Sequence, residues 1–449
     1  MYDIGILGAG PAGYVAAERA GKLGLSAVIF DKRELGGVCL NEGCIPSKTL
    51  LYTAKLYDST KNGEKYGISC ENVSFDFGKI MKRKDKVVKK LVGGVAQKMK
   101  NHRVEVVKAE ATIKERKRET ILISAGNKDF ECKNILICTG SEAAIPPIKG
   151  LDLKYALTNR EILQLTELPE SLNIIGGGVI GVEFANFFSV MGTKVNVFEM
   201  MDEILPGVDT EFSSMLRAEL VKYGVNFYIG TTVTELDKTT VIIRRNGKTE
   251  KVEAEKLLVS VGRKPNVEGI GLEKLGIEFT SKGIKIDHSC RTNIPNVYAA
   301  GDITGFSLLA HTASREAEVA VNNIAGKKDV MRYNAIPAVV YTNPEISSVG
   351  LTEDEARKKN IPVKVVKLPL AFAGRFIAEN EGKNGLIKII VGEKHQELLG
   401  FHMIGNPSSE IIYGAAMAIE MQMRIKDMQQ IVFPHPTVSE IIKEAVFEF

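Results

Sequence analysis

Two copies of one glycine-rich pattern constrain the fold of this chain more than any other feature of its sequence. Each copy starts with an apolar run, passes through three glycines in the order G-x-G-x-x-G, and ends a second apolar run at an acidic residue. The first copy runs from Gly8 to Asp31 and the second from Gly176 to Glu199, a span of 23 residues in both. A pattern repeated with this spacing predicts two copies of one ligand-binding unit.

The residues around each glycine motif predict the order strand, glycine turn, helix, strand. Units of this kind build parallel sheets that are covered by helices. The predicted fold class is therefore α/β, with two Rossmann-like dinucleotide-binding domains. Strands are expected over Asp3–Leu7, Ser26–Phe30, Leu172–Ile175 and Lys194–Phe198, with helices that end near Leu23 and Met191 and closing strands within Asn134–Ser141 and Lys256–Arg263.

The glycines and the acidic residue of each copy suit the two ends of a dinucleotide. Glycine lets the backbone approach a pyrophosphate, the following helix N-terminus stabilises its charge, and the acid accepts hydrogen bonds from ribose hydroxyls. One such motif alone could be an ordinary turn, but two with matched spacing favour two nucleotide sites. The residues expected to bind are Gly8, Gly10, Gly13 and Asp31 in the first site, and Gly176, Gly178, Gly181 and Glu199 in the second.

The residues that follow Glu199 bear on the choice of nicotinamide cofactor. A carboxylate at this position repels the 2′-phosphate of NADP, and sites for that phosphate usually supply an arginine. The segment Met200–Ile204 contains no positive charge. NAD is therefore expected in preference to NADP.

Two of the six cysteines, Cys39 and Cys44, stand in the distinctive segment Gly36–Lys48, while the other four are scattered. No second Cys or His pair lies at ligand spacing, so we expect no metal site. Residues five apart in an ideal helix have Cα atoms about 8–9 Å apart, whereas a disulfide needs about 4.4–6.8 Å. A disulfide here therefore requires a distorted segment, which Gly43 and Pro46 can provide. Cytosolic disulfides are more often catalytic than structural, which favours a redox-active pair over a structural bridge.

A second candidate for chemistry lies near the C-terminus, where His435 is followed five residues later by Glu440. A thiolate, not a thiol, attacks a disulfide, so a reactive cysteine pair benefits from a nearby base. His435 can serve as that base, and Glu440 can fix its tautomer and raise its basicity. A single histidine of this kind is more often an ordinary surface or core residue than a catalytic base, and the sequence by itself does not bring His435 next to Cys39.

The basic segment Gly78–Arg103 allows two interpretations. Its lysines, Lys84 among them, could form a nucleic-acid patch, but apolar residues such as Leu91 recur at helical spacing. This spacing favours an amphipathic helix with its lysines in solvent and its apolar residues packed. The net charge of +4 is small for 449 residues and does not indicate a nucleic-acid partner.

Further elements lack a nucleotide motif. Short alternating runs between Val104 and Phe130 predict a small antiparallel meander. Beyond Tyr333, a strand at Leu386–Val391 and a helix at Ser409–Met421 indicate a third unit with another function.

No segment is both apolar and long enough for a membrane helix, because the most apolar stretch, Leu172–Met191, contains four glycines and Glu183. A strand begins almost at Met1, which leaves no room for a signal peptide. We therefore expect a cytoplasmic protein that begins at residue 1 and binds neither membrane nor nucleic acid.

Taken together, these motifs resemble the pyridine-nucleotide disulfide oxidoreductase family and, within it, the dihydrolipoamide dehydrogenases. The resemblance spans essentially the whole chain. The cysteine segment and the segment around His435 are highly specific, whereas the glycine motifs are shared far more widely. The segments that carry the resemblance are Gly8–Gly13, Gly36–Lys48, Gly176–Glu183, Val261–Asn266, Ala300–Asp302, Tyr341–Gly350 and His435–Glu440.

The resemblance implies FAD in the first site, NAD in the second, and oxidation of protein-bound dihydrolipoyl groups through a Cys39–Cys44 disulfide. It implies that Cys39 exchanges with the substrate and that Cys44 lies against the flavin. Lys48 is then expected near the reactive edge of the flavin, paired with Glu183. The other cofactor-binding residues expected from the resemblance are Ala111, Thr139, Gly140, Ser141, Asp302, Ala310, Ile180, Val233, Gly262 and Arg263.

The resemblance also implies a homodimer in which His435 and Glu440 complete the active site of the partner. The lipoyl group is expected on another protein, either the E2 component of a 2-oxo-acid dehydrogenase or the H protein of glycine cleavage. The expected domains are an FAD-binding domain from 1–143 and 264–332, an NAD-binding domain at 144–263, and an α+β dimerisation domain at 333–449.

Departures from the family pattern are few. Phe433 stands where another histidine is common, and we expect no lipoyl domain before Met1. Mercuric reductases carry an extra C-terminal cysteine pair and glutathione reductases carry arginines after the second acid, so both are disfavoured. Two alternatives stay open: an NADH-dependent reductase of another small disulfide, and a flavoprotein that serves mainly as a docking subunit.

Overall fold

The computed structural model describes residues 1–245 and 248–449, which divide into two compact units. Each unit is assembled from segments that are far apart in the sequence. Helices α3 (Cys44–Lys61) and α4 (Phe77–Asn101) each run from one unit into the other. The first unit consists of Met1–Thr49, Met81–Ala144 and Gly262–Arg332, and the second of Leu50–Ile80, Ile145–Val261 and Tyr333–Phe449.

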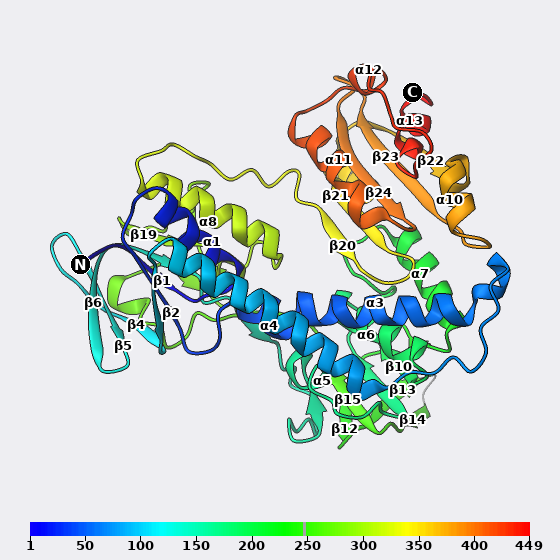
Figure 1. Ribbon diagram of the computed structural model, residues 1–449, viewed down its shortest axis with the longest axis horizontal. Helices are drawn as coiled ribbons and strands as arrows, with labels where there is room; N and C mark the ends of the chain where they lie inside the picture. Colours follow the sequence, from blue (N-terminus) through cyan, green and yellow to red (C-terminus); the bar gives the residue numbers. More distant parts are fainter. Residues whose placement is uncertain (246–247) are drawn as a thin grey trace. The chain divides into compact units, whose positions relative to one another are not determined.

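The first unit is organised around a sheet in the order β3-β2-β1-β6-β5-β4, and β19 also pairs with β6. β1 and β2 are parallel, apolar and largely buried, as expected for strands covered on both faces. Alanines on α1 (Pro11–Lys22) and α8 (Ala310–Ile324) allow these two helices to pack closely together (Figure 1). The strands are β1 (Tyr2–Leu7), β2 (Ala27–Asp31), β3 (Glu105–Lys108), β4 (Ala111–Arg116), β5 (Ile121–Ala125), β6 (Lys128–Ile137) and β19 (Val297–Ala299), with the short pairs β7 (Ser141–Ala143) with β16 (Arg263–Pro265) and β17 (Phe279–Thr280) with β18 (Gly283–Ile284).

The second unit contains a parallel sheet in the order β11-β10-β9-β15-β8. Helix α6 (Val179–Val190) follows the second glycine motif and is buried along most of its length, which explains why its sequence is apolar on every side. A small antiparallel sheet, β12-β13-β14, follows. The remaining bounds in this part are β8 (Ala156–Leu157), α5 (Asn159–Ile162), β9 (Ser171–Ile175), β10 (Lys194–Phe198), α7 (Thr210–Lys222), β11 (Asn226–Tyr228), β12 (Glu235–Asp237), β13 (Thr240–Arg245), β14 (Lys248–Val252) and β15 (Lys256–Val259).

The C-terminal part of the second unit is an antiparallel sheet in the order β20-β21-β24-β23-β22, covered by helices. Its core joins the inner face of β23 and β24 to apolar residues of α11 and α13. The bounds are β20 (Ala338–Val340), β21 (Ile346–Gly350), α9 (Glu353–Lys358), β22 (Val363–Pro369), α10 (Gly374–Glu379), β23 (Leu386–Gly392), β24 (Leu398–Ile404), α11 (Ser408–Glu420), α12 (Ile425–Met428) and α13 (Glu440–Val446).

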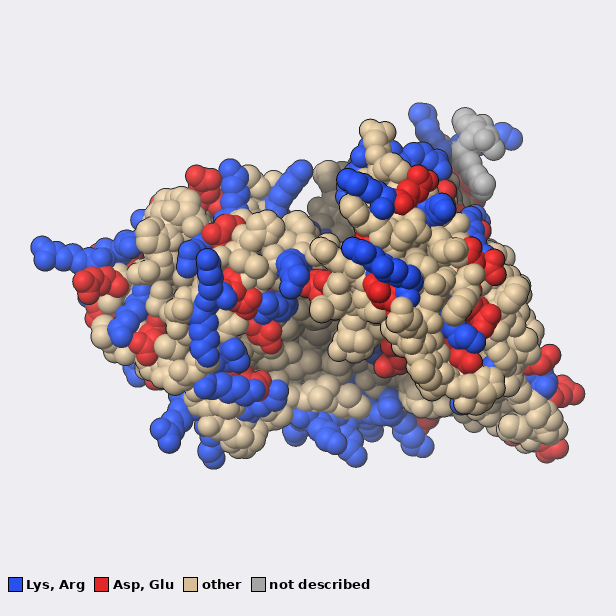
Figure 2. Space-filling view, turned by 90° about the horizontal axis from the view of Figure 1, so that it is seen from above, with Lys and Arg blue, Asp and Glu red and all other residues tan. Residues whose placement is uncertain are grey.

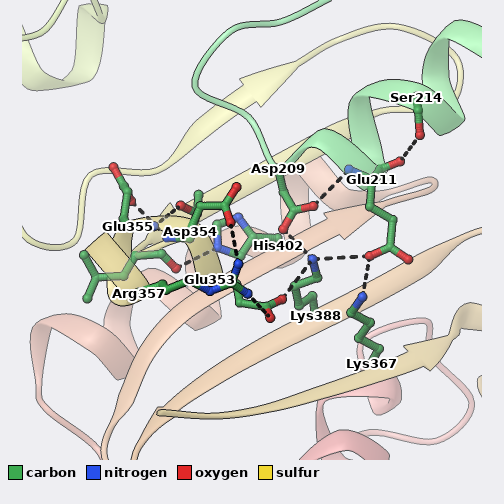
Figure 3. A network of polar contacts seen from close by, with 12 residues as sticks. Asp209, Glu211, Ser214, Glu353, Asp354, Glu355, Arg357, Lys367, Lys388 and His402 are labelled. Atoms are coloured by element: carbon green, nitrogen blue, oxygen red, sulfur yellow. Dashed lines mark hydrogen bonds and ion pairs between the residues drawn. The ribbon is translucent and has the colours of Figure 1, made fainter. Parts of the chain in front are cut away.

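A buried lysine joins this C-terminal sheet to the segment of the same unit that contains the second glycine motif. Lys388 of β23 has a side chain that is 3% exposed, and it forms an ion pair with Asp209, which caps α7. Its ammonium nitrogen also lies 3.3 Å from a carboxylate oxygen of Glu211 and 3.8 Å from one of Glu353 (Figure 3). A buried charge needs such matched partners. These contacts are among those that join the segments 145–261 and 333–449 of the second unit.

The structure confirms most predicted elements and corrects three points. β3 does not belong to an antiparallel meander, because it pairs in parallel with β2, while β4 and β5 are antiparallel as predicted. Lys84 is buried and not on the solvent face of α4, and Leu91 is 40% exposed and not packed. The amphipathic pattern predicts the helix correctly, but helical spacing alone does not show which of its residues face solvent.

Within residues 1–245 and 248–449, no helix combines the length and apolarity needed to cross a membrane. On the face drawn in Figure 2, Lys and Arg are interspersed with Asp and Glu. Ion pairs join many charged side chains among the described residues, such as Lys32 with Glu110 and Lys98 with Glu18.

Candidate active site

The first glycine loop has the backbone that a nucleotide pyrophosphate requires. Gly8 has φ +103°, and a Cβ on Gly13 would lie 1.8 Å from the carbonyl oxygen of Gly8. Asp31 accepts hydrogen bonds from the backbone N–H of Ala9 at 2.7 Å and of Arg33 at 2.8 Å. The N-terminus of α1 has no side-chain cap and no acidic residue in its first turn. Its donors therefore suit an anionic group.

The second glycine loop repeats this geometry. Gly176 has φ +104°, and a Cβ on Gly181 would lie 2.1 Å from the carbonyl oxygen of Gly176. Glu199 accepts hydrogen bonds from the backbone N–H of Gly177 at 2.7 Å and of Met201 at 2.8 Å. The N-terminus of α6 likewise has neither a side-chain cap nor an acidic residue. Both predicted nucleotide sites thus have residues that fit a dinucleotide.

The cysteine segment contains the distortion that the sequence requires. Helix α2 (Gly37–Glu42) ends at Gly43, whose dihedral angles are not helical, and Cys44 begins α3. The break lies at Gly43, while Pro46 is accommodated in the first turn of α3. Both cysteines are free thiols. The pKa of the Cys39 thiol is strongly raised, first because it shares a hydrogen bond with Cys44 and second because it is buried.

The cysteine pair lies beside the first glycine loop. A Cβ on Gly37 would lie 2.5 Å from Cα of Gly10, and the backbone N–H of Gly36 donates to the carbonyl of Ala9 at 2.8 Å. This close backbone contact requires glycine at position 37, which also has φ +58°, whereas a Cβ on Gly10 would lie 3.9 Å from Cα of Gly37, an ordinary contact distance. The fold therefore places a dithiol next to a dinucleotide-binding loop.

Two further side chains influence the thiols electrostatically. Burial first, and then negative charge on Cys39 and Cys44, raise the pKa of Tyr14 to about 12. The positive charge of Lys48 acts in the opposite sense on Cys39, favouring its thiolate. Lys48 thus lies close enough to Cys39 to act on it electrostatically, while its predicted place at the reactive edge of the flavin stays a prediction. The influence of Tyr14 was missed. Its position directly after the third glycine, in the first helical turn, was the available signal.

A polar cluster in the first unit gathers several of the predicted cofactor residues. Arg263 donates to the hydroxyl of Ser141 at 2.7 Å and forms an ion pair of 3.8 Å with Asp302. Burial lowers the pKa of Arg263, and the neighbouring acids oppose this effect. Thr139 donates to the carbonyl oxygen of Asn266 at 3.1 Å. Gly262 and Arg263 belong to the first unit, although in the sequence they follow the last strand of the second glycine-motif repeat.

His435 and Glu440 form a hydrogen-bonded pair in the second unit. The Nδ1 atom of His435 lies 2.9 Å from a carboxylate oxygen of Glu440, and its side chain is 81% exposed. The backbone N–H of Thr437 donates to Glu440, and this bond and the one from His435 hold the pKa of that carboxyl below its usual range. The carboxylate therefore stays charged and orients the imidazole. The pair presents an imidazole to solvent.

The other predicted residues lie at various points. Glu183 is buried and accepts a hydrogen bond from the backbone N–H of Tyr341 at 3.0 Å. Its pairing with Lys48 stays a prediction, as does any approach of His435 to the cysteines. Gly140 has φ +68°, Gly178 is the N-cap of α6, Ile180 lies in the first turn of α6, Ala111 begins β4, Ala310 begins α8, and Val233 is buried in an apolar cluster.

Sequence reasoning also missed Glu316 and Arg217. Glu316 of α8 is 1% exposed and accepts a hydrogen bond from the backbone N–H of Gly301 at 2.6 Å. An acid among alanines on one helix was its signal. Arg217 of α7 binds Glu203 with two hydrogen bonds, of 2.8 and 2.9 Å. Nothing local indicates this pair, because the partners are 14 residues apart.

Comparison with known proteins assigns the family. Residues 2–317 match the family model described as pyridine nucleotide-disulphide oxidoreductase, and residues 336–446 match its dimerisation domain. The chain belongs to the pyridine nucleotide-disulphide oxidoreductases.

Individual members of the family are similar over their full length. The chain is 40% identical to the dihydrolipoyl dehydrogenase of Geobacillus stearothermophilus, covering 98% of this chain and 94% of the relative. It is also 40% identical to a dihydrolipoyl dehydrogenase of Bacillus subtilis, covering 99% and 95%. Among solved structures, LpdA from Mycobacterium tuberculosis aligns with a TM-score of 0.91 at 25% identity, covering 99% of both chains. The HOCl-induced flavoprotein disulfide reductase RclA from Escherichia coli aligns with a TM-score of 0.86 at 26% identity, covering 99% of both chains.

Proposed function

We propose that this protein is a dihydrolipoyl dehydrogenase that oxidises protein-bound dihydrolipoyl groups with NAD as the acceptor. The observation that carries the proposal is the contact between the thiols of Cys39 and Cys44 beside the first glycine loop. Full-length relatives of 40% identity bear the same activity in their names, which supports the assignment.

The protein uses FAD and NAD, the cofactors of its family. We assign FAD to the loop of Gly8, Gly10 and Gly13, with Asp31 on its ribose, and NAD to the matching loop that ends at Glu199. Both loops fit, because their helix N-termini offer backbone donors and their acids are already oriented by two backbone N–H groups. Asp302, Ser141 and Arg263 would contact the polar part of FAD. When bound, FAD and NAD supply the two-electron chemistry that returns the dithiol to the disulfide.

The chain's own residues perform the thiol exchange in the proposed mechanism. His435 takes the proton of one dihydrolipoyl thiol, and the resulting thiolate attacks the sulfur of Cys39. The Cys39–Cys44 bond breaks, and Cys44 leaves as a thiolate. The second lipoyl thiol then attacks the lipoyl sulfur of the mixed disulfide, its proton passes to the departing sulfur of Cys39, and oxidised lipoyl is released. The substrate thus loses two electrons and two protons, and the cysteine pair gains two electrons.

Three roles complete the proposal. Glu440 holds the imidazole of His435 in the tautomer that can accept the proton. Lys48 stabilises thiolate charge at the cysteines. The C-terminal part, which matches a dimerisation domain, forms a homodimer in which His435 and Glu440 serve the partner's cysteines.

The wider setting follows the same reasoning. We propose a division into an FAD-binding domain from 1–143 and 264–332, an NAD-binding domain at 144–263 and a dimerisation domain at 333–449. The lipoyl group is expected on the E2 component of a 2-oxo-acid dehydrogenase or on the H protein of glycine cleavage, in the cytoplasm. Capture of a lipoyl-bearing protein from the source cell distinguishes these two partners.

Anaerobic titration of the flavin-loaded protein with dihydrolipoamide tests the reaction. We expect a long-wavelength charge-transfer band after two electrons and NADH formation once NAD is added. A protein that shows neither, but oxidises NADH with another small disulfide, is a reductase of that disulfide and not a dihydrolipoyl dehydrogenase.

The base role of His435 is tested by His435→Gln, for which we expect dihydrolipoamide turnover to fall about 10²- to 10⁴-fold. Glutamine keeps hydrogen-bonding capacity but does not accept the proton. The matched control is His395→Gln at an exposed position of the second unit. Unchanged turnover in His435→Gln, with flavin content equal to that of the control, removes this residue from the mechanism.

A further inference from the structure

The loop that follows Glu199 contains no arginine, but one of its residues, Glu203, forms an ion pair with an arginine of helix α7. Arg217 lies on α7, and its guanidinium binds both carboxylate oxygens of Glu203. One of these oxygens also accepts the backbone N–H of Ile204 at 2.9 Å. The Glu203 side chain is 13% exposed and that of Arg217 36%. The pair is therefore partly buried, bidentate and fixed to the loop backbone, unlike a mobile surface ion pair.

This ion pair adjoins the second glycine loop. Both the side chain of Ile204 and that of Glu199 would contact a Cβ placed on Gly177, at 3.1 Å each. The backbone N–H of Leu205 donates to the carbonyl of Gly177 at 2.9 Å. Glu203 directly precedes Ile204, which packs against the glycine turn that orients Glu199. The guanidinium of Arg217, which binds Glu203, therefore also lies near this turn.

Ion pairs anchor the N-terminal turn of α7, the helix that carries Arg217. Its N-cap, Asp209, is bound by the buried Lys388, and Glu211 in its first turn accepts from Lys388 and Lys367 (Figure 3). An arginine on a helix anchored in this way stays near the loop even when its carboxylate partner is removed. Arginine is always charged and suits a phosphate bidentately.

We propose that Glu203 determines cofactor specificity by sequestering Arg217, so that the 2′-phosphate of NADP finds no free cation beside Glu199. The inference rests on the proposed function, in which this loop faces the adenosine ribose of NAD. Selectivity for NAD then has two sources: repulsion by Glu199 and neutralisation of the nearby arginine. Removing the charge of Glu203 leaves a guanidinium available to a 2′-phosphate.

Direct binding of two nucleotide fragments tests this proposal without relying on turnover. Adenosine 2′,5′-bisphosphate and 5′-AMP are titrated by calorimetry into flavin-loaded, full-length protein, in which the first site is filled. We expect Glu203→Gln to improve the affinity for the bisphosphate relative to 5′-AMP on the order of tenfold, the gain of one hydrogen bond to a charged group. The kcat/KM ratio of NADP to NAD should move by a similar factor.

The double variant Glu203→Gln/Arg217→Gln separates the freed arginine from the mere loss of a negative charge. We expect it to return to the selectivity of the unaltered protein. The matched control is Glu219→Gln, which removes the carboxylate of another ion pair on the same helix, with Lys222, and should change nothing. An unchanged ratio in Glu203→Gln, or a raised ratio that persists in the double variant, overturns the proposal.

The result also distinguishes this inference from the proposed function. If the unaltered protein binds 5′-AMP but does not oxidise dihydrolipoamide, the proposed reaction is wrong while the binding comparison still decides the role of Glu203. If it binds neither fragment, both the role of Glu203 and the assignment of the NAD site are wrong.

Discussion

The two glycine loops have the same backbone and different surroundings. Their first glycines have φ +103° and +104°, and their acids accept the same two kinds of backbone N–H at 2.7 and 2.8 Å. The first loop is covered: Gly37 lies against Gly10 and leads directly into the cysteine helices. At the second loop, a Cβ on Gly178 would meet no described atom within 4 Å. The same backbone thus occurs once beside a close neighbouring segment and once with open space at its middle glycine, a difference that suits the proposed FAD site and the proposed NAD site.

The largest expected effect comes from filling the tightest glycine of each loop. Gly13→Ala places a methyl group 1.8 Å from the carbonyl oxygen of Gly8, and Gly181→Ala places one 2.1 Å from that of Gly176. We expect Gly13→Ala to lose flavin and all turnover, and Gly181→Ala to keep flavin but lose its reduction by NADH. Flavin absorbance per chain and anaerobic reduction by NADH measure these two outcomes. Equal loss of flavin in both variants would contradict the assignment of FAD to the first loop and NAD to the second.

The next prediction compares thiol exchange at the cysteines beside the first loop with flavin reduction by NADH, which we assign to the second loop. In Cys44→Ser we expect dihydrolipoamide turnover to fall at least about 10³-fold, because the acceptor disulfide can no longer form. Reduction of the flavin by NADH should continue, since it does not require the cysteine pair. Stopped-flow absorbance follows both reactions. Cys70→Ser, at an exposed cysteine, should behave like the unaltered protein.

A smaller effect is expected where the second loop is open. Gly178→Ala meets no protein atom, and its φ of −71° is allowed for alanine, so the fold should tolerate it. The methyl group would instead stand where the pyrophosphate approaches, and we expect the dissociation constant for NAD to rise about tenfold. Calorimetric binding tests this, with thermal unfolding as the control. A large drop in the unfolding midpoint would mean that the loop is not open.

The smallest effect concerns a glycine outside both loops. Gly94 lies inside α4, and a Cβ there meets open space. We expect Gly94→Ala to stabilise the protein by up to about 1 kcal/mol, because alanine favours the helix, and to leave both cofactors unaffected. Denaturant unfolding measures the change. If this variant loses either cofactor, the steric clashes at Gly13 and Gly181 are not the reason that those glycines are needed for cofactor binding.

Contacts between neighbours in sequence were predictable, and contacts fixed by tertiary packing were not. The glycine loops, the break at Gly43 and the His435–Glu440 pair follow from local spacing, and the structure contains all three. The parallel pairing of β3 depends on which strand lies free at the edge of the sheet, which short alternating runs do not reveal. Burial of Lys84 likewise has no signal within its own helix.

The same limit applies to the candidate site. Lys48 is found at the cysteines because it belongs to their segment, whereas Tyr14 reaches them from another helix. The absence of positive charge in Met200–Ile204 is correct as a statement about sequence. In space, Arg217 supplies a positive charge to that loop, already matched by Glu203.

The buried ion pairs of Lys388 bear on how this protein could be divided or recombined. A chain cut after Arg332 would keep Asp209 and Glu211 but lose the lysine that both of them bind. Conversely, a C-terminal fragment would carry Lys388 into solvent or leave it buried with only Glu353. The dimerisation part is therefore not an interchangeable module. Grafting it onto another nucleotide-binding part would require transferring the start of α7 as well.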